Sequence, residues 1–315
     1  MVMGTFRLIA LLFLLAAMGC SQDPPASHAV PISLTLKGDS LQATDHNDRQ
    51  GHEALLLTRF NSLAELKEVV TIAYAKDEVS LTYRSGSREV TSILRSGVSE
   101  DDFMRARRGS LWAKAQVSLM TPYAVVNRSN LMVIENLGRR RPWDFGKGDV
   151  AFYDLAETMV KNIMEEDIAR MPEKDTTEKG YLNTFNHITA QAFMTSVFSE
   201  KLADFVADVH ERHNMPELIS GVFTEAQLTD MKDGPTDNYI DLINNEWGQE
   251  LGKQLRYKYS LSRNTIWTPQ LMADYLNDIQ SYYSWAFQIG FRPFRITDEI
   301  VTRFAAKINL LLEEV

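Results

Sequence analysis

Residues 181–252 hold the side chains whose types and spacing could do chemistry. Two stretches of helical pattern meet at Ser199, a residue type that caps helix N-termini well. A turn between Phe198 and Ser199 would make these stretches an antiparallel hairpin, with His187 and His210 each 11 to 12 residues from the turn. Packed helices sit about 8 to 10 Å apart, so two inward imidazoles at one level could share a metal ion or a substrate.

A third helix is predicted at residues 237–258, opened by the cap candidate Thr236, and it carries a second polar face. The residues of this face fall at i, i+4, i+7 and i+11: Asp241, Asn245, Gly248 and Gly252. Glycine inside a helix costs about 1 kcal/mol relative to alanine, so the two bare positions need a reason. A neighbouring helix that approaches closely is the simplest one, and it would press against Asp241 and Asn245.

Together these residues have the types of a metal site with mixed nitrogen and oxygen ligands: His187, His210, Glu211 and Asp241. We expect a divalent metal such as Zn²⁺ at His187, His210 and Asp241, with Asn244 or Asn245 orienting a water or a substrate carbonyl. Such a metal could activate water for attack on an ester, phosphodiester or amide. Without a metal, a histidine and a carboxylate could act as general base and orienter. The same residues could instead form a satisfied polar network that fixes the helix register.

The motif His, then His-Glu, then Asp-x-x-Asn-Asn-x-x-Gly resembles a helical family of uncharacterised activity in secreted bacterial proteins and toxin-like polypeptides. The resemblance covers about 70 of 315 residues. It implies one shared site at His187, His210, Glu211, Asp241, Asn244, Asn245 and Gly248. Two positions depart from the family pattern, Asn186 in place of a basic residue and Ile243 in place of a histidine.

The first 20 residues, MVMGTFRLIALLFLLAAMGC, have the layout of an export signal: a basic residue, a short apolar run and a small residue before cysteine. The segment resembles the bacterial lipoprotein signal, with Gly19 as the small residue, although Ala17 stands where leucine is usual. We therefore expect residues 1–19 to be removed and Cys20 to be lipidated, which would anchor the chain stably in a membrane. An ordinary signal cut near Ala17 is the alternative.

Residues 20–51 are predicted to hold the lipidated Cys20 and a flexible tether, because the segment is rich in Pro, Ser, Asp and Gln and lacks aromatic residues. Ser21 follows the cysteine. By the sorting rule of Gram-negative lipoproteins, a residue other than Asp there implies the outer membrane, with the domain facing the periplasm. The expected partner is thus the membrane, through Cys20, and the sequence identifies no protein partner.

Charge and cysteine content exclude several classes of protein. Cys20 is the one cysteine, so no disulfide or cysteine metal site can stabilise the domain. The net charge of −9 makes nucleic-acid binding a poor candidate. Residues 83–150 hold 12 Lys/Arg and 7 Asp/Glu, whereas residues 151–250 hold 7 and 20. The basic part could face anionic lipid, or both parts could be solvated faces.

The periodicity predicts a mainly α, multi-helix globular domain with a small β-hairpin near its start. The hairpin is placed in the run Glu68–Tyr83, with a turn at residues 85–87. We divide the domain into residues 52–150 and residues 151–315, the second of which carries the candidate site. Helices are predicted at 100–119, 121–137, 150–170, 181–197, 200–213, 224–231, 237–258, 269–289 and 297–313.

The sequence therefore predicts an envelope-anchored lipoprotein of unknown activity. Its helical domain carries a His/Glu/Asp/Asn cluster that is either a structural network or a binding site. The alternative is a metal-dependent or His/carboxylate hydrolase.

Overall fold

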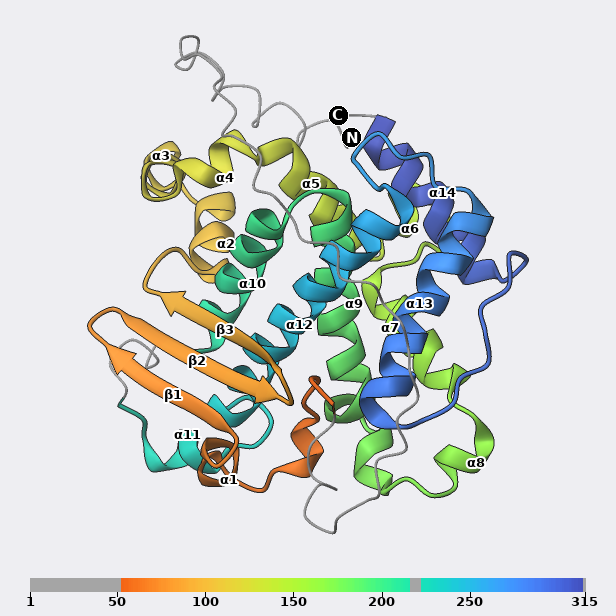
Figure 1. Cartoon of the computed structure of the whole chain (residues 1–315). Helices are drawn as coiled ribbons and strands as arrows, with labels where there is room; N and C mark the ends of the chain where they lie inside the picture. The colour runs from red at the N-terminus through yellow and green to blue at the C-terminus, as the bar shows by residue number, and fades with distance from the viewer. Residues whose placement is uncertain (1–51, 216–221, 314–315) are drawn as a thin grey trace. The chain divides into compact units, whose positions relative to one another are not determined.

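The longest helix, α12 (Pro235–Tyr259), runs through the middle of the computed structural model, which describes residues 52–215 and 222–313 (Figure 1). Pro235 takes the first helical position, where its missing N–H leaves no bond unmade. The helix therefore starts two residues before the predicted Asp237. Thr236 lies inside the helix with its hydroxyl buried and unpaired, so it is not the cap that the sequence suggested.

The predicted helical hairpin is confirmed by α9 (Asn183–Val197) and α10 (Glu200–Asn214). Ser199 caps α10, and its Oγ accepts a hydrogen bond from the Leu202 N–H at 3.2 Å. Helix α12 packs along this hairpin and is parallel to α9. Four polar contacts between α12 and the segment that contains α9 each join residues 58 positions apart in the sequence. This fixed register positions the candidate site.

The strands form a three-stranded antiparallel sheet in the order β1 (Val70–Ala75), β2 (Glu78–Ser85) and β3 (Arg88–Arg95). The predicted hairpin is therefore only part of the sheet. Gly86, in the left-handed region at φ +59°, lies in the predicted turn, and β3 follows it. The alternating burial of β3 is typical of a strand with one face on a core.

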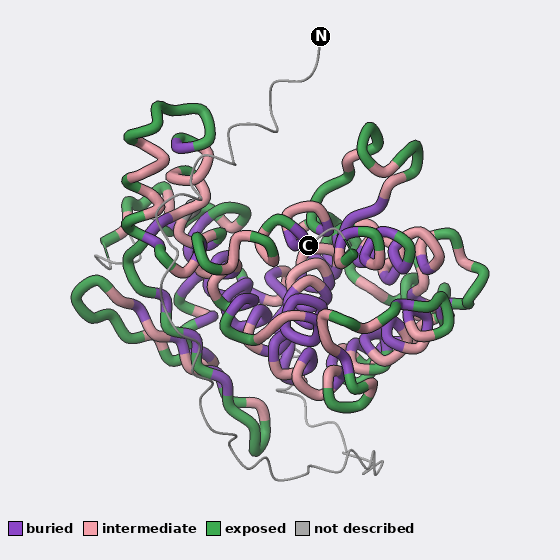
Figure 2. The backbone as a smooth tube through the Cα atoms, turned by 90° about the horizontal axis from the view of Figure 1, so that it is seen from above, coloured by how far each residue is buried: buried purple, intermediate pink, exposed green. Residues whose placement is uncertain are grey.

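Two apolar cores lie against α12. Figure 1 shows the sheet on one side of α12 and helices α13 and α14 on the other, and Figure 2 shows that buried residues concentrate in the middle of the fold. The sheet and α1 (Leu63–Lys67) pack on Tyr239, Ile243 and Trp247 of α12. The second core contains Leu251 and Leu255 together with α9 and three further helices: α7 (Phe152–Asn162), α13 (Pro269–Phe287) and α14 (Glu299–Glu313). The remaining helices are α2 (Glu100–Arg108), α3 (Leu111–Met120), α4 (Pro122–Val126), α5 (Arg128–Leu137), α6 (Pro142–Phe145), α8 (Glu165–Ile168) and α11 (Glu225–Thr229).

Three predicted helices are interrupted. The first breaks at Gly109, which is extended between α2 and α3, and the second breaks at Asn127, between α4 and α5. The third breaks after α7 because Ile163 leaves the helix to form a β-bridge with Phe291. The Met164 N–H then donates to the Gly290 carbonyl at 2.9 Å, so a tertiary contact replaces a helical one.

The described residues all fall in one compact unit, and the predicted mainly α class with a small β element is confirmed. Among these residues, no helix is long and apolar enough to cross a bilayer. The predicted signal peptide, Cys20 and the tether lie outside the described residues.

Candidate functional site

A ladder of polar pairs follows the seam between α12 and the segment that contains α9 and the helical turn Glu178–Leu182 before it. The hydrogen-bonded pairs recur every four residues along both helical segments, as expected for side chains that share one helix face. The pairs are Lys179 with Asp237 (2.5 Å), Asn183 with Asp241 (2.9 Å), His187 with Asn245 (3.0 Å) and Gln191 with Gln249 (3.3 Å).

The two glycines make this close approach possible, as their spacing predicted. A Cβ on Gly248 would lie 2.8 Å from the Ile188 carbonyl oxygen and 2.7 Å from the Gln191 Cβ. A Cβ on Gly252 would lie 2.6 Å from the Ala192 carbonyl oxygen. Both positions therefore exclude any side chain, and α12 approaches α9 backbone to backbone.

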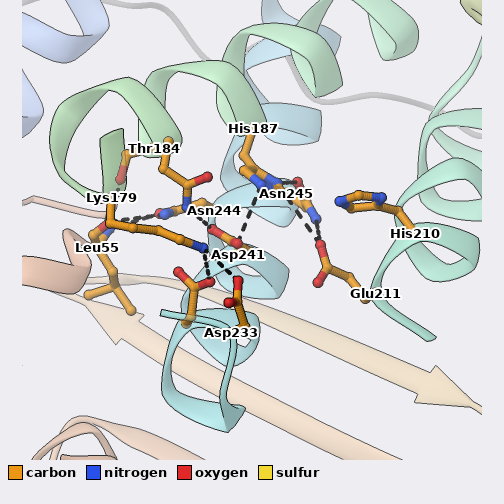
Figure 3. A network of polar contacts seen from close by, with 12 residues as sticks. Leu55, Lys179, Thr184, His187, His210, Glu211, Asp233, Asp241, Asn244 and Asn245 are labelled. Atoms are coloured by element: carbon orange, nitrogen blue, oxygen red, sulfur yellow. Dashed lines mark hydrogen bonds and ion pairs between the residues drawn. The ribbon is translucent and has the colours of Figure 1, made fainter. Parts of the chain in front are cut away.

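The centre of the ladder brings together three potential metal ligands from three helices: His187, Glu211 and Asp241 (Figure 3). One ligand atom of each lies within 4.8 Å of the other two. His187 Nε2 is 3.3 Å from Asp241 Oδ2, and His187 Nδ1 is 4.0 Å from Glu211 Oε1. Two ligands bound to Zn²⁺ at about 2.0 Å in tetrahedral geometry are about 3.3 Å apart, so the His187 and Asp241 atoms are already spaced for one ion.

Hydrogen bonds assign the proton on His187. Asn245 Nδ2 donates to Glu211 Oε1 at 3.3 Å, which turns the amide oxygen of Asn245 toward His187 Nδ1 at 3.0 Å. Nδ1 must then carry the hydrogen, and the lone pair of Nε2 faces Asp241. Burial, together with the positive charge of His210, lowers the pKa of His187 to about 4, so the ring is neutral at pH 7. A neutral imidazole with a free Nε2 is the form that binds a metal.

The carboxylates of the site lack sufficient compensating charge. Burial raises the pKa of Glu211, and the nearby charge of Asp241 raises it further. Burial likewise raises the pKa of Asp241, against the opposing influence of Lys179. Asp237 completes the acidic group: burial raises its pKa to about 7, and its Oδ1 is buried without a hydrogen-bond partner. A cation bound between Glu211 and Asp241 would relieve this repulsion.

His210 is level with His187, as the hairpin predicted, and their ring centroids are 6.2 Å apart. It is not in the three-ligand group, which differs from the expected metal set. Successive residues point about 100° apart around a helix, so α10 directs Glu211 inward and leaves the His210 side chain 51 % exposed. The His210 Nδ1 is 3.2 Å from Glu100 Oε2, and this hydrogen bond raises the pKa of His210 to about 9.

Asn244 also lies apart from the ligand group. Its Oδ1 accepts from the Leu55 N–H and its Nδ2 donates to the Leu55 carbonyl, both at 2.9 Å. Thr184 Oγ1 donates to the same carbonyl at 3.2 Å. The amide of Asn244 is therefore used to attach the segment before α1 to α12, whereas Asn245 orients the site.

Five residues of this arrangement were not singled out from the sequence: Lys179, Asn183, Gln191, Asp237 and Gln249. Their signal was the four-residue repeat, which places Asp237 one turn before Asp241 and Asn183 one turn before His187. Asn183 Nδ2 donates to Asp241 Oδ1, leaving Oδ2 toward His187. Lys179 Nζ lies between Asp237 and Asp233, the latter at 3.6 Å.

A pocket of about 680 Å³ lies elsewhere, where Thr158 and Asn162 of α7 face Arg303 of α14. Its three arginines are engaged by neighbouring groups: Arg295 by Asp298, Arg303 by Glu299, and Arg292 by the Lys161 carbonyl. The pocket is lined by none of the residues of the ladder, whose buried carboxylates and neutral imidazole are the groups suited to binding a cation.

Comparison of the chain with protein-family models, with curated proteins and with solved structures found no match. The family resemblance of residues 181–252 therefore remains a prediction from the motif.

Proposed function

We propose that this chain is an envelope lipoprotein, anchored through Cys20, whose helical domain binds a divalent transition metal such as Zn²⁺. The ligands are His187, Glu211 and Asp241. The observation that carries the proposal is the convergence of these three side chains, each from a different helix, within 4.8 Å.

Charge and orientation support a metal rather than a neutral polar network. A structural network stabilises a fold best when every group in it is satisfied. Here burial raises the pKa of both Glu211 and Asp241, so the site holds two carboxylate charges poorly without a cation. Asp237 also keeps a buried oxygen without a hydrogen-bond partner. Asn245 and Asn183 act as the outer partners that a metal site needs, since they orient His187 and Asp241.

A metal-dependent hydrolase is the second candidate, and the position of His210 favours it. Three protein ligands leave a fourth tetrahedral position for water, as in catalytic zinc sites. His210 stands at the exposed rim of the site, 6.2 Å from His187, and its raised pKa keeps the ring charged at neutral pH. It could then donate a proton to the leaving group of an ester, phosphodiester or amide.

Calorimetric titration of the metal-stripped, lipid-bearing chain with Zn²⁺ tests the proposal. We expect one ion per chain, with affinity lowered at least tenfold by Glu211→Gln or Asp241→Asn, because each removes a charged ligand. Glu246→Gln is the matched control. It removes a carboxylate whose pKa is also raised by burial and which lies on α12, like Asp241, but outside the ligand group.

A polar network without metal gives the opposite pattern. The wild-type chain would then bind no Zn²⁺ with one-to-one stoichiometry, and Glu211→Gln would alter only the thermal stability. Equal loss of affinity in Glu246→Gln would also overturn the assignment, since it would place the ion elsewhere.

A further inference from the structure

Helix α3 (Leu111–Met120) has its apolar side turned outward. None of its ten residues is buried, even though only one of them, Lys114, is charged. Leu111, Trp112, Leu119 and Met120 are all exposed, Trp112 at 76 % and Leu119 at 78 %. Globular proteins normally turn the apolar stripe of a helix toward the core, so α3 reverses the usual arrangement.

The exposed apolar side chains of α3 share one side of the helix, and the next helix adds further exposed apolar side chains. At 100° per residue, the exposed apolar side chains of α3 fall within one half of the helix circumference. Helix α4 follows after one residue, Thr121, and adds Val125 and Val126, the latter 84 % exposed. We call the exposed apolar side chains of α3 and α4 the outer apolar face. The two helices lie at the edge of the fold (Figure 1). Monomeric proteins rarely leave such a face uncovered without a function.

Basic side chains directly precede this face in the chain. The last turn of α2 holds Arg105, Arg107 and Arg108, directly before α3 begins. Arg105 pairs with Asp102, and Arg107 approaches Glu135 at 3.6 Å. Within the described part of the chain, Arg108 and Lys114 make no ion pair. The face therefore combines aliphatic side chains, an exposed tryptophan and cations, which is the composition of helices that lie in the interface of an anionic bilayer.

We infer that the outer apolar face of α3 and α4 docks on the surface of an anionic lipid bilayer. The inference rests on the lipid anchor proposed above. Cys20 precedes His52 by 52 − 20 = 32 residues, so even a fully extended chain keeps the domain within about 110 Å of the anchoring membrane. This confinement raises the effective concentration of lipid at the face, so a modest apolar surface is enough to dock.

Tryptophan quenching by lipids with brominated acyl chains tests the inference on the lipid-bearing chain. The protein is placed in vesicles of phosphatidylethanolamine and phosphatidylglycerol, or of phosphatidylcholine alone. We expect the anionic vesicles to quench the wild-type fluorescence more, because the cations beside α3 favour them. The comparison is made in a Trp143→Phe/Trp285→Phe background, because Trp143 is 79 % exposed and Trp285 is 39 % exposed. In that background Trp112→Phe should remove the quenchable component, since Trp247 and Trp267 are buried.

The variant that tests the face itself is Leu111→Ser/Leu119→Ser. We expect it to lower the quenching at least about twofold, since two of the inserted side chains become polar. Ile266→Ser is the matched control: Ile266 is 78 % exposed in the loop between α12 and α13, so its loss should leave the quenching unchanged.

Three results would overturn the inference. They are equal quenching with and without Trp112 in the Trp143→Phe/Trp285→Phe background, an effect of Ile266→Ser equal to that of Leu111→Ser/Leu119→Ser, or a concentration-dependent dimer in sedimentation that the Leu111/Leu119 variant abolishes. The last would assign the face to a second copy of the chain. Mass spectrometry of the mature N-terminus tests the lipid anchor separately, and Zn²⁺ titration tests the metal site at His187. Failure of the anchor or of the metal site is therefore distinguishable from failure of membrane docking by the outer apolar face.

Discussion

Replacing Gly248 by alanine adds one methyl group where α12 meets α9. That group would lie 2.8 Å from the Ile188 carbonyl oxygen and 3.0 Å from the Ile188 Cα. Because these are backbone atoms, a change of rotamer cannot relieve the contact, and the helices must separate. Overpacking of this kind costs about 1 to 3 kcal/mol, with the upper part of the range expected for backbone contacts.

Alanine also favours the helix by about 1 kcal/mol over glycine, which offsets part of this cost. We therefore expect Gly248→Ala to lower the free energy of unfolding by about 2 kcal/mol, which is a fall in Tm of about 4 to 8 °C for a domain of this size. The separation also strains the 3.0 Å contact between His187 and Asn245, one turn away. Loss of such an outer partner lowers metal affinity about 10-fold or more.

Urea denaturation and Zn²⁺ titration of the same variant measure both effects. Gly138→Ala is the control, because Gly138 is exposed, has αR backbone angles, and its added Cβ would meet the Ile134 carbonyl oxygen at an ordinary 3.4 Å. It should be neutral or slightly stabilising. If Gly248→Ala is as stable as Gly138→Ala and binds Zn²⁺ like the wild type, the close contact between α9 and α12 is not the reason for the glycine.

Three further predictions concern the pH dependence of stability, the role of Asn244 and the lipid anchor at Cys20. Burial raises the pKa of Glu211 in the folded chain above its value in the unfolded chain. The contribution of Glu211 to the free energy of unfolding is therefore fully present below the unfolded-state pKa and is lost as the pH rises through the folded-state pKa. Glu211→Gln should therefore flatten the fall in stability of the metal-free protein between about pH 5 and about pH 8, as measured by urea denaturation; an unchanged slope would mean that Glu211 is not the titrating group. Asn244→Ala leaves the Leu55 N–H buried without its partner and should lower the unfolding free energy by about 1 to 3 kcal/mol while Zn²⁺ affinity is retained, whereas a selective loss of affinity would place Asn244 in the site. Cys20→Ser should release the chain from membranes or leave it uncleaved, and unchanged membrane fractionation would contradict the anchor.

Local sequence determined where most of the helices lie and which residues share one side of a helix. Ser199 caps α10 as expected, and Gly248 and Gly252 mark the contact with α9 because only a close backbone approach explains two bare positions on one face. The level of His187 and His210 followed from counting residues around one turn. These features depend on spacing along the chain, which the sequence contains in full.

Tertiary structure decided which of two neighbouring residues faces the site. Glu211 rather than His210 joins His187 and Asp241, and Asn245 rather than Asn244 orients the imidazole. Adjacent helical residues differ by about 100° in direction, so a modest rotation of α10 or α12 exchanges their roles, and that rotation is set by packing against the sheet and α9. Helix breaks such as the one at Ile163 arise in the same way, since the β-bridge partner of Ile163, Phe291, lies 128 residues (291 − 163) further along the chain.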